Sequence, residues 1–150
     1  MTYRVYDNER KVWLKDNIYL NPDGELFRIK KLIFGIIKTP IALSFDRYIY
    51  HKSIDLYDKD GILVYEGDYI LANVAEDKEV IGLVCYAHEL SSYVILCTNS
   101  DEFYNLGSEI TEYIKVIGNV FDGYKEVNNH DEQTLSETKE WTRKIYRRTF

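Results

Sequence analysis

Four acidic side chains stand close together in the segment DKDGILVYEGD, residues 58–68, where they could bind a metal ion or act as an acid–base pair. A calcium loop of the EF-hand kind needs oxygen ligands at alternate positions, a glycine at the sixth position and a carboxylate at the twelfth. Placing Gly61 sixth puts Leu56 first and Gly67 twelfth. Neither residue offers a side-chain oxygen, so this frame predicts no calcium site.

Glu66 and Asp68 could instead serve as a catalytic acid and base. No nucleophile or third partner with a recognisable spacing accompanies them. Asp60 and Gly61 suit a hairpin turn, while Gly67 could adopt a positive φ in a second bend and Asp68 could accept hydrogen bonds from nearby amides. We therefore interpret the segment as a hairpin followed by a tight bend, and its four acidic residues as the first to mutate if an activity is found.

The cysteines and histidines show no pattern of a metal or nucleophile site. Cys85 and Cys97 each lie among aliphatic residues, where a free thiol packs as a small hydrophobic group. His51, His88 and His130 are far apart and have no ligand spacing with each other or with the cysteines. We expect no metal, no cofactor and no catalytic residues, and hence no enzymatic activity.

The composition favours strands over helices. Fourteen tyrosines, six phenylalanines and two tryptophans accompany many Ile and Val residues. Turn residues at 7–10, 21–24 and 59–61 predict three hairpins, and a fourth is predicted around AHELS at 87–91. The segment EYIKVIGNVF, residues 112–121, is apolar on both of its alternating faces, as in a strand buried on two sides. The fold class predicted is mainly β, a β-rich α+β arrangement.

Charge and hydropathy are those of a globular protein without a membrane span. The chain is 45% hydrophobic and 29% charged, with a formal net charge of −6. Its longest apolar stretch, LIFGIIKTPIAL, is interrupted by Lys38 and Pro40 and is shorter than the roughly 20 residues that cross a bilayer. The first residues lack the apolar core of a secretory signal, so we expect a cytoplasmic protein.

Three blocks of the sequence resemble the YopX-like family of phage and prophage proteins. They are YRVYDNERKVW near the start, LYDKDGILVYEGDYI in the middle and YIKVIGNVFD near residue 120. The positions that match the family pattern are Tyr3, Tyr6, Asp7, Trp13, Asp58, Lys59, Asp60, Gly61, Tyr65, Glu66, Gly67, Asp68, Ile117, Gly118, Asn119, Val120 and Phe121. The middle block is the most specific, because Tyr-Glu-Gly-Asp seldom follows an Asp-Lys-Asp-Gly turn.

The resemblance implies a phage or prophage origin and a β-rich fold, and no established activity comes with it. It implies one domain over residues 1–126, in which 1–50 add N-terminal strands to a barrel-like part at 51–126. That part is expected to be a small bent sheet or an SH3-like barrel. The matching Glu, Gly, Asp and Asn positions are then architectural. The resemblance ends near residue 124, where DGYKEV replaces the usual ending.

Residues 127–150 are predicted to be a polar linker and a C-terminal helix. Thr134 and Glu137 could form a capping box, and the helix is expected from about Leu135 to Arg148. The tail carries five basic and four acidic residues, a net of +1, so residues 1–126 hold −7. Candidate partner-binding residues in this helix are Trp141, Arg143, Lys144, Ile145, Arg147 and Arg148.

The hypothesis we favour is a protein-binding or adaptor module that acts on a host or phage protein through exposed aromatics or the Trp141 helix. A nucleic-acid-binding small β-barrel is the alternative, with aromatics for stacking and the basic C-terminus for phosphates. The sequence pI of about 5.1 opposes a large phosphate-binding footprint. The excess of aromatic and aliphatic residues also predicts a homo-oligomer.

Overall fold

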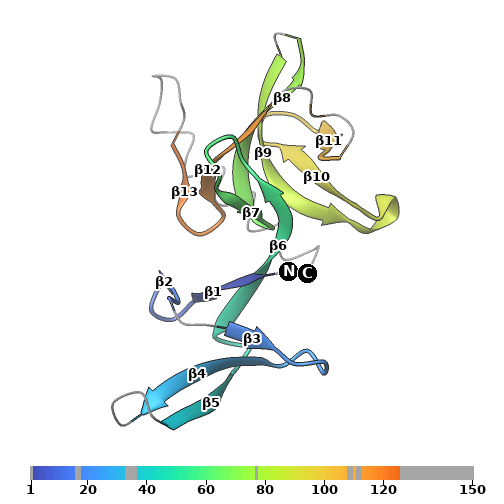
Figure 1. Cartoon of the computed structure of the whole chain (residues 1–150). Coiled ribbons are helices and arrows are strands. Elements are labelled where there is room, and N and C mark those ends of the chain that lie inside the picture. Colours follow the sequence, from blue (N-terminus) through green and yellow to red (C-terminus); the bar gives the residue numbers. More distant parts are fainter. Residues whose placement is uncertain are drawn as a thin grey trace. The chain divides into compact units, whose positions relative to one another are not determined.

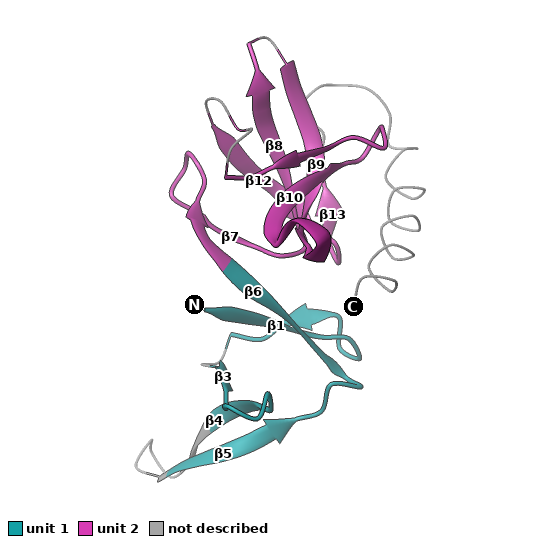
Figure 2. Ribbon diagram, turned by 90° about the vertical axis from the view of Figure 1, so that its right-hand side faces the viewer, with its two compact units in different colours: residues 1–53 teal, residues 54–150 magenta. Residues whose placement is uncertain are grey.

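A computed structural model describes residues 2–15, 18–32, 37–76, 78–107, 110 and 113–125. The chain divides into two compact units, residues 1–53 and 54–150 (Figure 2). The described residues are mostly in β-strands, so the mainly β fold class is confirmed. The predicted C-terminal helix and all of its candidate partner-binding residues lie outside the described residues.

The first unit is built from strands β1 to β5 and most of β6. Their bounds are β1 Tyr3–Asp7, β2 Val12–Trp13, β3 Ile18–Leu20, β4 Leu26–Leu32, β5 Ile37–Leu43 and β6 Tyr48–Tyr57. β1 pairs antiparallel with both β2 and β6, whereas β3, β4 and β5 form a separate antiparallel sheet in that order. Val5, Leu26 and Leu43 form the buried core, which therefore joins β1 to the three-stranded sheet.

The second unit is a six-stranded sheet that curls into a half-barrel (Figure 1). Six strands form this sheet: β8 Asp68–Ala75, β9 Lys78–Ala87, β10 Ser92–Cys97, β11 Phe103–Asn105, β12 Ile114–Asn119 and β13 Gly123–Tyr124. The unit also contains strand β7, Leu63–Tyr65, and a short 3-10 helix, η1, at His88–Leu90. The sheet order is β11-β10-β9-β8-β12-β13, and β7 instead pairs with β6. The bent sheet expected of this part of the chain is thus present.

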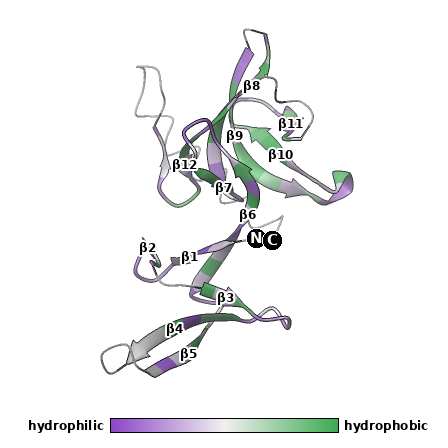
Figure 3. Ribbon diagram, in the orientation of Figure 1, coloured by the Kyte–Doolittle hydropathy of each residue, from purple (hydrophilic) through white to green (hydrophobic). Residues whose placement is uncertain are grey.

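Both faces of the half-barrel sheet bury apolar side chains. Ile70 and Val84 belong to one core cluster, while the alternate residues Tyr69 and Leu83 belong to another. Because successive side chains of a strand point to opposite faces, the two clusters lie on opposite sides of the sheet. Apolar residues occupy much of β7, β10 and β12 (Figure 3). β12 contributes Ile114 to the first cluster and Ile117 to the second, as expected of a strand buried on two sides.

The predicted turns lie where the sequence places them. Gly24 and Gly61 have φ values of 84° and 77°, in the left-handed region that glycine tolerates best. The segments 7–10, 21–24 and 59–61 join β1 to β2, β3 to β4 and β6 to β7, and residues 88–91 join β9 to β10. All four predicted hairpins are therefore confirmed. No helix among the described residues is long and apolar enough to cross a membrane.

Candidate functional site

The carboxylate of Asp58 ties the β6–β7 hairpin to a distant strand. Its Oδ1 accepts hydrogen bonds of 2.9 Å from the Asp60 amide and 2.8 Å from the Ile62 amide. Its Oδ2 accepts a bond of 3.0 Å from the amide of Val116, which lies 58 residues later in β12. A backbone bond of 3.0 Å from the Lys59 amide to the Ile114 carbonyl runs beside it. Asp58 thus fixes both the turn and its attachment to the half-barrel.

These amides also decide the charge state of Asp58. The side chain is only 6% exposed. Burial raises the pKa of its carboxyl, but the hydrogen bonds from Val116, Ile62 and Asp60 together outweigh burial, so that the pKa is lowered overall. A carboxyl that must act as a general acid near neutral pH needs a raised pKa. Asp58 is instead a buried anion held by main-chain amides.

The Glu66-Gly67-Asp68 bend connects three strands of the second unit. Gly67 has a φ of 79°. Its amide donates a hydrogen bond of 2.9 Å to the Val84 carbonyl, and its carbonyl accepts a hydrogen bond of 2.9 Å from the Val120 amide. Asp68 is 1% exposed, and its Oδ2 accepts a 2.9 Å bond from the Tyr65 amide. The expected bend and the amide bond to Asp68 are both present. This geometry gives the block a role in positioning the start of β8 against β9 and against the residue that follows β12.

Glu66 lies near two other titratable groups, Tyr93 and Cys85. Burial, the charge of Glu66 and a hydrogen bond to it raise the pKa of Tyr93 to about 12. Burial and the same negative charge raise the pKa of Cys85 to about 11. Burial also raises the pKa of Cys97. Both thiols therefore stay protonated near neutral pH and are poor nucleophiles.

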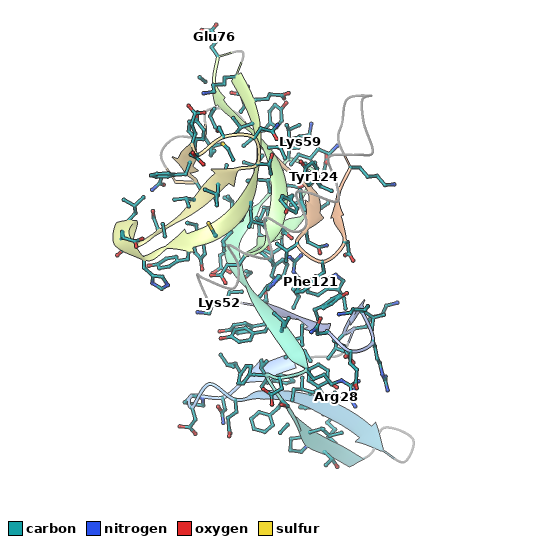
Figure 4. All side chains as sticks on the ribbon, turned by 180° about the vertical axis from the view of Figure 1, so that it is seen from behind. Arg28, Lys52, Lys59, Glu76, Phe121 and Tyr124 are labelled. Carbon is teal, nitrogen blue, oxygen red and sulfur yellow. The ribbon has the colours of Figure 1, made fainter. Side chains whose placement is uncertain are left out.

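The third block forms the tight hairpin between β12 and β13. Asn119 Oδ1 accepts bonds of 3.0 Å and 3.1 Å from the amides of Phe121 and Asp122. A Cβ at Gly118 would overlap the Gly123 carbonyl oxygen and the backbone of Tyr124. Phe121 and Tyr124 extend from this hairpin (Figure 4) and pack in the second core cluster. Only glycine fits at position 118.

The first block places a second buried aspartate in the first unit. Asp7 is 1% exposed, and its two oxygens accept bonds of 3.0 Å and 2.7 Å from Nε and Nη2 of Arg47. Oδ1 also accepts bonds of 3.1 Å from the amides of Glu9 and Arg10. The hydrogen bonds from Arg47 are the largest cause that lowers the Asp7 pKa to about 2. Asp7 therefore anchors the β1–β2 turn as an ion pair.

A cluster of polar aromatic residues lies beside that turn. Trp13 makes edge-to-face contacts with Tyr6 and His51, at ring-centroid distances of 5.1 Å and 5.6 Å. The Arg4 guanidinium carbon lies 4.5 Å from the centroid of the Trp13 ring, and Arg4 Nη2 donates a 3.3 Å bond to His51 Nδ1. His51 is completely buried. Burial and then the charge of Arg4 lower its pKa to about 3, so the imidazole is neutral.

Tyr6, Asp7 and Trp13 belong to the family motif, whereas no pattern in the sequence pointed to Arg4, Arg47 or His51. Arg4 lies on β1, Arg47 in the turn before β6 and His51 on β6. Arg4 and His51 are 47 residues apart in sequence. The register of β1 against β6, in which Arg4 pairs with His51, brings them together. A predicted β1–β6 pairing would have been the only signal able to find them.

Exposed apolar side chains concentrate at the end of the β6–β7 hairpin. Leu56, Tyr57 and Ile62 are 38%, 63% and 49% exposed. We call these three residues the hairpin tip. Lys59 lies on the same hairpin (Figure 4), with its Nζ 4.6 Å from the centroid of the Tyr113 ring. The tip thus exposes three apolar side chains beside a turn that Asp58 holds with three hydrogen bonds.

Charge is divided unequally between the two units. Residues 1–53 carry ten basic and six acidic residues, a net of +4. Residues 54–126 carry four basic and fifteen acidic residues, a net of −11. The described residues contain no group of three or more His, Cys, Asp or Glu side chains that could hold a metal ion. The described acidic residues of the second unit therefore form no cluster of that kind.

Comparison with known proteins places these blocks in a family. The model of the YopX protein family matches residues 2–125. The chain belongs to the YopX family. The motif positions at Asp7, Asp58, Gly67, Asp68 and Gly118 all lie inside the matched YopX region. No curated protein sequence matches the chain.

Two solved structures resemble this YopX-family chain. YopX from Bacillus subtilis matches with a TM-score of 0.54 and 14% sequence identity, covering 81% of this chain and 93% of that one. Protein EF1440 from Enterococcus faecalis matches with a TM-score of 0.44 and 21% identity, covering 80% of this chain and 92% of that one. The likeness to Bacillus subtilis YopX shows a shared fold.

Proposed function

We propose that this YopX-family protein is a phage- or prophage-encoded, non-enzymatic binding module that recognises a host or phage protein in the bacterial cytoplasm. The observation that carries the proposal is the hairpin tip, where Leu56, Tyr57 and Ile62 are exposed on a turn fixed by Asp58. Exposed large apolar side chains that gather on one element are typical of protein interfaces. A rigid hairpin also loses little conformational freedom when it binds.

The acidic residues of the middle block support a binding role over a catalytic one. Asp58 accepts three main-chain hydrogen bonds, and Asp68 is buried and accepts one from Tyr65. A general acid or base must instead reach its substrate. The net charge of −11 on residues 54–126 favours a protein partner over nucleic acid at the half-barrel. Self-association stays a prediction, which light scattering at high protein concentration would test.

Affinity capture from a bacterial lysate tests the proposal. The full-length protein is immobilised, the lysate is treated with nuclease, and the retained proteins are identified for the wild type and for a Tyr57→Ser/Ile62→Ser variant. The matched control is Leu90→Ser/Phe103→Ser, because these residues of the same unit are 50% and 51% exposed. We expect a retained protein that the wild type and the control both bind and that the hairpin-tip variant loses. Equal retention by all three proteins would contradict the proposal.

A further inference from the structure

Three aromatic rings lie together where β9 ends and β10 begins. Tyr86 of β9 lies directly opposite Tyr93 of β10 in the register, and their ring centroids are 5.1 Å apart with an angle of 71° between the ring planes. The ring of His88, in η1, lies 5.1 Å from that of Tyr86 with an angle of 80° between the planes. We call Tyr86, His88 and Tyr93 the ring cluster. The Tyr86 ring is thus close to perpendicular to two neighbouring rings.

The ring cluster lies where the first core cluster of the half-barrel reaches the surface. Val84 and Ile95 pair across β9 and β10, are completely buried and belong to that core. Tyr86 and Tyr93 are each two residues away from them on the same strands and therefore lie on the same face of the sheet. Both tyrosines are partly buried, and His88 is exposed. The aliphatic core thus gives way to aromatic rings at this end of the two strands.

Two carboxylates lie near Tyr93. Glu66 is 7% exposed and accepts a hydrogen bond from the Tyr93 hydroxyl, and Asp55 on β6 is exposed. Burial, the charge of Glu66 and this hydrogen bond raise the pKa of Tyr93 to about 12, and the charge of Asp55 acts in the same direction. The phenol of Tyr93 is therefore neutral near neutral pH. The negative charge beside the rings belongs to the two carboxylates.

This combination of groups is suited to a cation. The face of an aromatic ring is its negative side, and a cation placed over it is attracted. Two rings in a T-shaped arrangement leave a corner that the faces of both rings border. The described residues contain no group of three or more His, Cys, Asp or Glu side chains that could hold a metal ion. Aromatic rings with one or two carboxylates are instead typical of sites for organic cations.

We propose that the ring cluster binds an organic ammonium group in the corner between Tyr86 and Tyr93, with Glu66 and Asp55 supplying the opposite charge. The ammonium belongs either to a lysine side chain of another protein or to a small quaternary amine, because ring faces attract both in the same way. The net charge of −11 on residues 54–126 also attracts cations to this unit. None of the three rings belongs to the hairpin tip, so this site and the proposed function can each fail alone.

NMR titration of the isotope-labelled full-length protein with N-acetyl-lysine methylamide tests the proposal. We expect saturable shifts of the amide signals of residues 86–93. The uncharged probe N-acetyl-norleucine methylamide, which lacks the ammonium, should cause none. Tyr86→Leu should weaken binding of the lysine probe about threefold to thirtyfold, because the attraction between cation and ring is lost. Tyr86→Phe keeps the ring and should bind as the wild type does.

Phe103→Leu is the matched control, because Phe103 is a 51% exposed aromatic residue of the same sheet outside the ring cluster, and it should leave binding unchanged. Asp55→Asn removes an exposed carboxylate and should weaken binding at low salt without altering the core. Titration with tetramethylammonium chloride distinguishes the two sources of the ammonium. Tighter binding of tetramethylammonium than of the lysine probe would assign the site to a quaternary amine, and the reverse order would assign it to a protein lysine.

Three results would overturn the proposal. The first is that neither cationic probe shifts the amide signals of residues 86–93. The second is that the norleucine probe shifts them as much as the lysine probe does, which would make the site merely apolar. The third is equal affinity of the wild type and Tyr86→Leu for both cations, which would mean that the acidic unit attracts them without the rings. Unchanged amide signals far from position 86 verify that Tyr86→Leu folds.

Discussion

Asp7 in the first unit and Asp58 in the second are both buried carboxylates that hold a hairpin, and each is neutralised differently. Asp7 binds the Arg47 guanidinium through both oxygens. Asp58 instead accepts three main-chain amide hydrogen bonds, one of them from a strand distant in sequence. The first unit is rich in arginine and lysine, whereas the second has few cations available. The family motif therefore contains two buried aspartates that stabilise hairpins differently, Asp7 through an ion pair and Asp58 through main-chain amides.

The largest loss of stability is expected from a steric clash in the second unit. Gly118→Ala places a Cβ against the backbone of Gly123 and Tyr124 and should lower the free energy of unfolding by about 4 kcal/mol or more. Gly61→Ala is the control, because Gly61 has a positive φ but open space around its Cβ position, and should cost about 1 kcal/mol. Urea denaturation measures the unfolding free energy of both variants. Equal losses would mean that the backbone of the β12–β13 hairpin moves to accommodate the added methyl group at position 118.

Asp58→Asn tests the carboxylate that holds the second unit. The amide of asparagine cannot accept all three main-chain bonds, so we expect a loss of about 2–4 kcal/mol in unfolding free energy. Asp60→Asn is the matched control on the same turn, since its side chain is 52% exposed, and should change stability by less than about 0.5 kcal/mol. A similar loss for both variants in urea denaturation would contradict the special role of Asp58.

Asp7→Asn tests the ion pair that holds the first unit. The variant should melt at a lower temperature, and the difference from the wild type should shrink as salt rises, because the Arg47 side chain is 33% exposed and can be screened. The lowered Asp7 pKa stabilises the fold above its ordinary value of 3.8, and this contribution disappears as the pH falls toward about 2. The difference in melting temperature between Asp58→Asn and the wild type should not depend on salt. Thermal melts at about 0.05 M and about 1 M salt distinguish the two cases.

His51 should make the first unit sensitive to acid at a higher pH than Asp7 does. Its pKa is lowered from 6.5 to about 3 in the folded protein, so the unfolded chain binds more protons between these values. Stability should fall as the pH drops below about 6.5, by at most about 1.4 kcal/mol per pH unit. His51→Gln removes this proton uptake and should flatten the profile. Parallel profiles for the wild type and the variant would show that His51 is not buried as a neutral group.

The turns could be predicted from the sequence, because they depend on the residue types within the turn itself. The residues at 21–24 and at 59–61 contain Asn, Asp, Pro or Gly in turn positions, and both hairpins are confirmed. The bond from Val116 to Asp58 could not be predicted, because it joins residues 58 positions apart and depends on the curl of the sheet. The same applies to Arg47, which nothing local links to Asp7. The charge difference between the units became visible only once their boundary was known.

Amide hydrogen exchange measured by NMR on the full-length protein tests most directly whether the motif aspartates fasten the fold. In the wild type, the amides of Ile62 and Val116 should be strongly protected, because the Asp58 carboxylate accepts both of their hydrogen bonds. In Asp58→Asn, their protection should fall, while the amides of Glu9 and Arg10, which bind Asp7, keep theirs. Unchanged protection of the Val116 amide in Asp58→Asn would contradict the role of Asp58 in joining the β6–β7 hairpin to β12.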